Sequence, residues 1–455
     1  MASPMTTLNT NSIASTWRKT FAPLSVPSLR LFFCGLAISL IGTWLQSTAQ
    51  ALLVFQLSHG HSEPVAITSC CTALPLIFLG PPLGSLTSHI PRRLLVIATQ
   101  VAELFLAAVL GLLVHLHVAT LTHVYLLAFL LGCAESVYFP AVQRLLHEVA
   151  GSANIRAVVG LNAVISNIAR FAGPMLAGLL IGSFGMAVAF FLNSLSFIAV
   201  ILSLMFIRVD DRQQSNLAGR WTFLTSARYL FGDARLLSVF IGVALMNVFG
   251  QSCYALVPAL EMGSARATGL LLGSAGLGSL TSALCVMPFF QGFRRPGLLI
   301  SCSLLWMGFF LVLTASFHSL WWQLLSMWCL GLSTTILFVT TLGLVQTVSP
   351  APAHGALLGL FSALFYGSQP VAALGLAFVA DHGSSSHTIQ GAAFIEVCGS
   401  LLLLLLPQWR SWMLPGETQG IEGEIATKES RLERAAMKPV AMRSNNNEER
   451  STPRS

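Results

Sequence analysis

Long apolar segments alternate with short polar connections over most of this chain. A helix needs about 20 apolar residues to cross the hydrocarbon core of a bilayer, and a helix pairs its own backbone polar groups there. The pattern therefore predicts an all-α membrane protein with twelve transmembrane helices. The segments are 30–54, 65–86, 93–113, 121–143, 157–181, 184–207, 236–260, 268–290, 297–316, 320–345, 355–380 and 386–406.

The longest internal connection divides these segments into two sets of six. This layout is typical of transporters that are built from two structurally repeated halves. The residues after 406 are rich in Glu, Arg, Ser and Asn, a composition that favours disorder. The predicted units are a cytoplasmic N-terminal segment 1–29, a six-helix bundle 30–207, a cytoplasmic linker 208–235, a second six-helix bundle 236–406 and a disordered cytoplasmic tail 407–455.

Charge is scarce and unevenly placed. Only 9% of the residues are Asp, Glu, Lys or Arg, against about 25% in soluble domains, and the mean hydropathy is +0.75. This composition excludes most soluble enzymes and nucleic-acid-binding domains. Nearly all of the 24 Lys and Arg residues fall on one side of the predicted membrane; Arg170 lies inside a segment and Arg266 on the other side. Basic residues favour the cytoplasmic side, so both termini and the linker are predicted to be cytoplasmic.

Several short motifs follow one another along the chain in a recognisable order. They are Ser28-Leu-Arg-Leu-Phe-Phe33, Ser39-Leu-Ile-Gly-Thr-Trp-Leu-Gln46, Leu161-Asn162 with Asn167, Ala169-Arg170 and Gly173-Pro174, Ser226-Ala-Arg-Tyr-Leu230 with Arg235, and Gln346 with the run 355–360. Together they resemble the major facilitator superfamily, and most of all its bacterial exporter branch, which includes the enterobactin exporter. The resemblance covers about residues 28–406. It implies a monomeric transporter of the bacterial inner membrane, in which two six-helix bundles rock around a midplane cavity.

The resemblance also implies a charged cytoplasmic gate, which this chain carries in a partly neutral form. The superfamily loop between the second and third spans has an acidic residue at the position of Ser88. In the fourth segment, Tyr138 and Val142 occupy positions at which the branch often has charged residues. The expected gate residues are Gly84, Ser88, Arg92 and Arg93.

Ionisable residues at membrane depth are the first candidates for chemistry, because burying them is costly. The helical rise places Glu135 about 12 Å and Arg170 about 20 Å from the cytoplasmic ends of their segments. We expect the two to face each other, with Glu135 as a proton carrier; a structural ion pair between neighbouring helices is the alternative. Glu103 and Glu396 are weaker candidates for proton coupling.

Amide and aromatic side chains are predicted to line the cavity. Gln46 and Gln50 lie one helical turn apart in the first segment, and Asn247 and Gln251 lie one turn apart in the seventh, its repeat counterpart. Polar groups that face lipid are unfavourable, so both pairs are expected to face the interior, where they bind either a substrate or each other. The substrate-cavity candidates are Trp44, Gln46, Gln50, Asn167, Asn247, Gln251, Tyr254, Tyr366 and Gln369.

Gly173, Pro174 and Gly178 form a predicted helix-packing motif. Small residues let helices approach closely, and proline lets a helix bend. The motif resembles one that exporters of the superfamily carry in their fifth span, and it favours export. Most of the 11 histidines lie in predicted outer loops, but their irregular spacing matches no metal site and is typical of interfacial polar residues.

The sequence contains no phosphate-cradling loop of the GxxxxGK[ST] type, so a gradient is the predicted energy source. No enzymatic activity, catalytic residue, metal or cofactor is expected, and nucleic acid is not an expected partner. The predicted function is proton-coupled efflux of a small, partly apolar molecule, such as a drug, a siderophore or a metabolite. A lysophospholipid flippase and a non-transporting membrane sensor or scaffold remain as alternatives.

Overall fold

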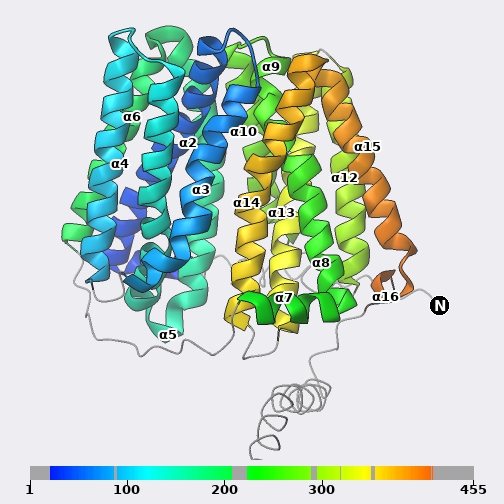
Figure 1. Ribbon diagram of the computed structural model, residues 1–455. Helices are drawn as coiled ribbons and strands as arrows, with labels where there is room; N and C mark the ends of the chain where they lie inside the picture. Colours follow the sequence, from blue (N-terminus) through cyan, green and yellow to red (C-terminus); the bar gives the residue numbers. More distant parts are fainter. Residues whose placement is uncertain are drawn as a thin grey trace, which may run out of the picture.

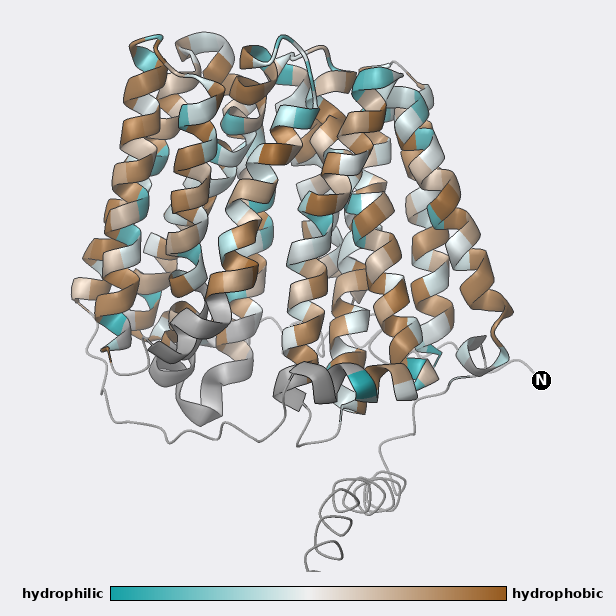
Figure 2. Cartoon of the chain, in the orientation of Figure 1, coloured by the Kyte–Doolittle hydropathy of each residue, from teal (hydrophilic) through white to brown (hydrophobic). Residues whose placement is uncertain are grey.

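The computed structural model describes residues 21–86, 90–206, 223–287, 295–317, 319–349, 354–410 and 412. Long helices stand side by side in this structure, and their connections lie at the two ends of the bundle (Figure 1). One end carries α9 and the other carries α7, and we name the two ends after these helices. Apolar residues cover much of the visible helix surface (Figure 2). This is the surface expected of a bundle whose solvent is lipid.

The described helices form two groups in chain order. The N-terminal half comprises η1 (Ala22–Ser25), α2 (Pro27–Leu57), α3 (Glu63–Leu86), α4 (Arg92–His115), α5 (Leu121–Phe184) and α6 (Met186–Met205). The C-terminal half comprises α7 (Phe223–Gly232), α8 (Ala234–Leu245), η3 (Met246–Gly250), η4 (Gln251–Leu256), α9 (Val257–Leu260), α10 (Ala265–Thr281), η5 (Ser282–Val286), α12 (Pro296–Ser316), α13 (Leu320–Val348), α14 (His354–His382), α15 (Ser385–Leu405) and α16 (Pro407–Arg410).

The predicted multi-pass helical architecture is confirmed. Among the described residues, 11 helices are long and apolar enough to cross a membrane. The second predicted segment corresponds to α3, whose apolar stretch Glu63–Leu79 is shorter than the others. The exact number of twelve spans therefore stays a prediction.

Helix α5 contains two of these spans without an interruption in its helical state. Its 64 residues would extend about 96 Å if the helix were straight, three times the thickness of a bilayer core. However, Val124 near its start and Ile181 near its end belong to one buried cluster. The chain therefore turns back within α5, and the spans Leu121–Tyr138 and Gly160–Phe184 form a first and a second limb.

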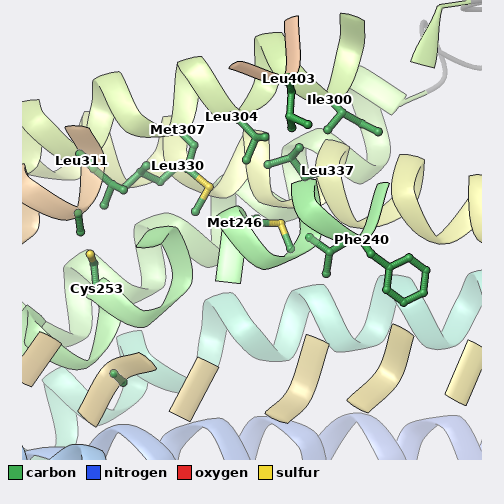
Figure 3. Close-up of a cluster of buried hydrophobic side chains, with 14 of the residues drawn as sticks. Phe240, Met246, Cys253, Ile300, Leu304, Met307, Leu311, Leu330, Leu337 and Leu403 are labelled. Carbon is green, nitrogen blue, oxygen red and sulfur yellow. The ribbon is translucent and has the colours of Figure 1, made fainter. Parts of the chain in front are cut away.

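Each half has its own apolar core. The N-terminal half has two clusters: one contains Phe33 and Leu145, and the other contains Leu52 and Phe190. The C-terminal half is built around one larger cluster. Figure 3 shows part of it, including Met246, Leu304 and Leu330, which are almost completely buried.

Ordered packing continues past the predicted start of the tail at residue 407. Trp409 is completely buried, and its indole Nε1 donates a hydrogen bond to Ser301 Oγ of α12 at 3.0 Å. Trp412 is also buried, at 4% exposure. The predicted linker 208–235 likewise includes the helix α7. Residues 1–20 and 413–455 lie outside the described residues.

We expect Trp409→Ala to destabilise the C-terminal half. Truncation of a fully buried aromatic side chain typically costs about 3–5 kcal/mol, and this one also leaves Ser301 without its donor. The temperature of unfolding in detergent, followed by fluorescence-detected size exclusion, should fall clearly. Trp321→Ala is the matched control, because Trp321 is 80% exposed. An equal effect of the two substitutions would show that Trp409 does not anchor this segment.

Candidate substrate site and gate

Four of the predicted site residues converge where the two halves meet. Arg170 lies in the second limb of α5, and its guanidinium carbon is 5.0 Å from the centre of the Trp44 ring of α2. This distance is typical of a cation–π contact. Tyr254 of η4 and Tyr366 of α14, both from the C-terminal half, are close enough to interact electrostatically with Arg170. A cation and three aromatic rings from both halves thus form one cluster, which we call the Arg170 cluster.

Glu135 does not form the expected ion pair in this conformation. In the described part of the chain, no salt bridge joins Glu135 to Arg170. Glu135 instead interacts electrostatically with Glu103 of α4. Glu103 is 5% exposed; its Oε2 accepts a hydrogen bond of 2.8 Å from Gln100 Nε2, and its Oε1 has no partner among the described residues. The N-terminal half therefore places two membrane carboxyls within electrostatic range of each other.

Three of the predicted cavity amides make hydrogen bonds within their own half. Gln46 Oε1 accepts a bond of 2.8 Å from Asn193 Nδ2 of α6. Gln251 Nε2 donates to Thr334 Oγ1 of α13 at 2.7 Å, and Gln369 Nε2 donates to the backbone oxygen of Gln251 at 3.4 Å. These bonds tie helices together inside a half. The partners Asn193 and Thr334 were not singled out in the sequence.

The other predicted amides differ in their surroundings. Asn167 Nδ2 donates to the carbonyl of Ala163 in its own helix at 2.8 Å, and Gln50 is half-buried. Asn247 is 1% exposed, and neither its amide nitrogen nor its amide oxygen has a hydrogen-bond partner among the described residues. Asn247 is therefore unusual, because a buried polar group normally has a partner.

The predicted gate lies only partly within the described residues. Gly84 belongs to α3 and Arg92 begins α4, whereas Ser88 lies outside the described residues. Arg93 donates a hydrogen bond of 2.9 Å from Nη2 to the backbone oxygen of Met205, the last residue of α6. Cations favour helix C-termini, where carbonyls lack intrahelical partners. In this conformation Arg93 thus stabilises the end of a helix in its own half.

A different acidic residue joins the two halves at the α9 end. The two carboxylate oxygens of Asp381, near the end of α14, accept hydrogen bonds of 2.8 Å each from the backbone nitrogens of Ser62 and Glu63. Glu63 begins α3 and Ser62 directly precedes it, and the first amides of a helix have no intrahelical acceptors. The Nδ1 atom of His61 lies 3.8 Å from the same carboxylate. Asp381 therefore caps a helix of the opposite half, and we call this contact the Asp381 cap.

Glycines allow the second limb of α5, in the N-terminal half, to touch α10, in the C-terminal half. A Cβ atom on Gly269 would lie 2.5 Å from the backbone oxygen of Pro174 and 2.7 Å from the Cα of Gly178. A Cβ atom on Gly276 would lie 2.5 Å from the backbone oxygen of Arg170. Pro174 and Gly178 of the predicted packing motif thus face the other half. Gly173 faces the backbone of α2, beside Trp44 and Leu45.

The contacts between the halves thus extend from the α9 end to mid-depth. The Asp381 cap lies at the end itself, and a hydrogen bond of 3.2 Å from Cys70 Sγ to the backbone oxygen of Pro370 follows further along α3 and α14. Gly276 then touches the backbone at Arg170. This arrangement closes the α9 end above the Arg170 cluster.

The matching family model spans residues 18–420 and is described as a transmembrane secretion effector of the major facilitator type. The chain belongs to this family. It is therefore a membrane transporter of the major facilitator type. A curated relative, an uncharacterized major-facilitator-type transporter called YfiS from Bacillus subtilis (strain 168), is 29% identical over 174 residues. That match spans 38% of this chain and only 40% of the relative.

Solved transporters share the fold at low sequence identity. A peptide transporter of the POT family, crystallised with alafosfalin, has a TM-score of 0.67 at 12% identity, over 86% of this chain and 96% of the other. The nucleoside transporter NupG has a TM-score of 0.61 at 15% identity, over 83% and 97% of the two chains. These structures establish the arrangement of the helices.

We expect Asp381→Asn to open the α9 end. The substitution removes the negative charge from a helix N-terminus, which is worth about 1–2 kcal/mol, or roughly a 5- to 30-fold shift in the ratio of closed to open molecules. Spin labels on Val118→Cys and His387→Cys, placed after the exposed native cysteines have been replaced by serine, would report the distance between the halves.

A population with a longer distance should grow in Asp381→Asn. Asp233→Asn is the matched control, because Asp233 caps α8 within a single half, accepting from the backbone nitrogens of Arg235 at 3.0 Å and Leu236 at 3.3 Å. Unchanged distances in Asp381→Asn would show that the cap does not hold the halves together.

Proposed function

We propose that this transporter exports a small, partly apolar molecule by alternating access, with protons as the driving ion. The observation that carries the proposal is the Arg170 cluster, which combines residues of both halves beneath a closed end. Aromatic faces contact apolar ligands, and a guanidinium adds recognition of an anionic or electron-rich group. When the halves rock, the relative positions of Arg170 and the two tyrosines change, and a ligand held between them gains access to the other side.

The distribution of basic residues supports the direction of the cycle. If α7 and the linker lie in the cytoplasm, as the basic side of the chain favours, the α9 end faces outward. The conformation described here is then closed to the outside, and it is the state in which an exporter loads its substrate from the cytoplasm. In this proposal α3 also crosses the membrane, which brings the number of spans to twelve. Both termini are cytoplasmic, and the chain resides in a bacterial inner membrane. Pro174 and Gly178 support export, because they lie at the contact that must separate to release the substrate outward.

Proton coupling is assigned to Glu135. Two carboxyls that are close together at membrane depth cannot both be charged without a large cost, so the pair formed by Glu135 and Glu103 tends to hold at least one proton. A rocking motion that brings Glu135 nearer to Arg170 would stabilise the carboxylate and release that proton. Proton release would then follow the change of conformation.

Everted membrane vesicles test the function directly. Uptake of ethidium, a catecholate siderophore and a fluorescent lysophospholipid should be compared with and without a proton gradient, which an uncoupler removes. Accumulation of ethidium or the siderophore that stops with the uncoupler would support proton-coupled export. Gradient-independent movement of the lysophospholipid alone would favour a flippase and contradict the proposal.

Glu135→Gln tests the coupling residue. The glutamine resembles the protonated acid in volume, so folding and downhill exchange of the exported probe should persist, while gradient-driven accumulation should fall about tenfold or more. Glu261→Gln is the control, because Glu261 follows α9 at the end of the bundle. Full gradient-driven accumulation by Glu135→Gln would reduce Glu135 to a structural residue.

A further inference from the structure

The seventh predicted segment, 236–260, is not a continuous α-helix. The α-helix α8 ends at Leu245, a π-helical segment follows over Met246–Gly250, and a 3-10 segment follows over Gln251–Leu256 before α9 begins. Single π-helical turns inside α-helices occur frequently at functional sites. The residues that pack against this break are therefore candidates for a functional role.

An acidic side chain without a hydrogen-bond partner faces this break. Glu396 of α15 is completely buried, and neither carboxyl oxygen has a partner among the described residues. Its Oε1 lies 3.3 Å from the position that a Cβ atom on Gly250 would take, so the carboxyl points at the π-helical segment. Asn247 belongs to the same segment and is also buried with both amide atoms unpaired. Two unpaired polar groups thus lie at one irregular stretch of helix.

The N-terminal half has a corresponding contact between a glycine and a buried polar side chain, but there the polar side chain is hydrogen-bonded. In α2, the counterpart of the seventh segment, Gly42 faces the amide oxygen of Asn193 in α6. Asn193 donates to Gln46 at 2.8 Å and accepts from the Ser196 hydroxyl at 3.0 Å. The helix α2 continues unbroken through this point. The repeat that has a paired amide is therefore regular, and the repeat that has an unpaired acid is broken.

The groups around Glu396 provide no positive charge in the described structure. The titratable groups that interact with it electrostatically are the Cys253 thiol and the Tyr254 phenol, both on η4. From α12, Met307 packs against the same face of Gly250, and from α8, Leu245 packs against α15 at Gly399. A carboxylate buried without a cation or donors is strongly unfavourable, so Glu396 is neutral in this conformation. Tyr254 also interacts with Arg170, which links the site to the Arg170 cluster.

We propose that Glu396 is a proton-binding site of the C-terminal half, and that its protonation is coupled to the shape of the seventh segment. The reaction is the reversible ionisation of one carboxylic acid, with the proton exchanged with water. Loss of the proton creates a buried carboxylate that needs donors, and rearrangement of the broken segment next to it can supply them from the Asn247 amide. Because η4 carries Tyr254, the same rearrangement changes the surroundings of Arg170. This inference deepens the proposed transport cycle and rests on it.

The purified protein tests this site without any substrate. Infrared difference spectra recorded during a pH titration report the carbonyl band of protonated carboxylic acids. We expect a band that is present at neutral pH, is lost as the pH is raised, and is absent in Glu396→Gln. The band should remain in Glu261→Gln. If Glu396→Gln does not fold, Glu396→Leu serves instead, because an apolar side chain suits a site without polar partners.

Coupling to the conformational cycle is tested in the same experiment. A change that favours the open α9 end must shift the proton affinity of a coupled site, because linkage is reciprocal. The titration midpoint of the Glu396 band should therefore move by roughly one pH unit in Asp381→Asn and stay in place in Asp233→Asn. A band that does not titrate, or one with the same midpoint in Asp381→Asn, would overturn the proposal. Failure of vesicle export would leave this result intact, so the two proposals can fail separately.

Discussion

The Asp381 cap is the contact on which the described conformation depends. The first amides of α3 need acceptors, and the structure supplies them from α14, the only route by which these amides are paired in the described part of the chain. The bond is charge-assisted, and the Asp381 side chain that accepts it is only 10% exposed. In the proposed cycle, this contact stabilises the closed α9 end and must break when that end opens. The glycine contacts of α5 and α10 extend the closure to the depth of Arg170.

The two halves have corresponding helices, but their buried polar side chains differ in hydrogen bonding at the contact between the first and last span of each half. In the N-terminal half, the amides between α2 and α6 satisfy each other, and the helices are regular. In the C-terminal half, Asn247 and Glu396 have no hydrogen-bond partner among the residues that the structure describes, and both lie at a broken helix. Unpaired buried groups are costly and persist mainly where function requires them. The broken segment beside Glu396 is therefore the element that we expect to rearrange, whereas the hydrogen bond between Gln46 and Asn193 holds α2 against α6.

The sequence predicts the helices well because long apolar runs leave little choice in a bilayer. It also singles out Trp44, Arg170, Tyr254 and Tyr366, which the structure brings within interaction range of one another. It fails where rotation of a helix decides the outcome. Glu135 and Arg170 have compatible depths, but depth does not fix the direction of a side chain, and no salt bridge joins the two in the described part of the chain.

Two other features leave no local signal in the sequence. The π-helical form of Met246–Gly250 is seen only in the structure, where Gly250 packs against Met307 and Glu396. The Asp381 cap joins residues 319 positions apart, and its partners are backbone amides that any sequence would supply.

Reversible bridging of the halves tests most directly whether the α9 end must open during transport. The two substitutions His61→Cys and His382→Cys place one thiol on each side of the Asp381 cap. In a protein without other reactive cysteines, a bifunctional reagent that forms a disulfide with each thiol can join them. We expect the bridge to stop gradient-driven efflux of the exported probe, and we expect reductant to restore it. A bridge between His382→Cys and His387→Cys, within one half, should leave efflux unchanged. Continued efflux by molecules whose halves are fully bridged would show that the α9 end does not have to open during transport.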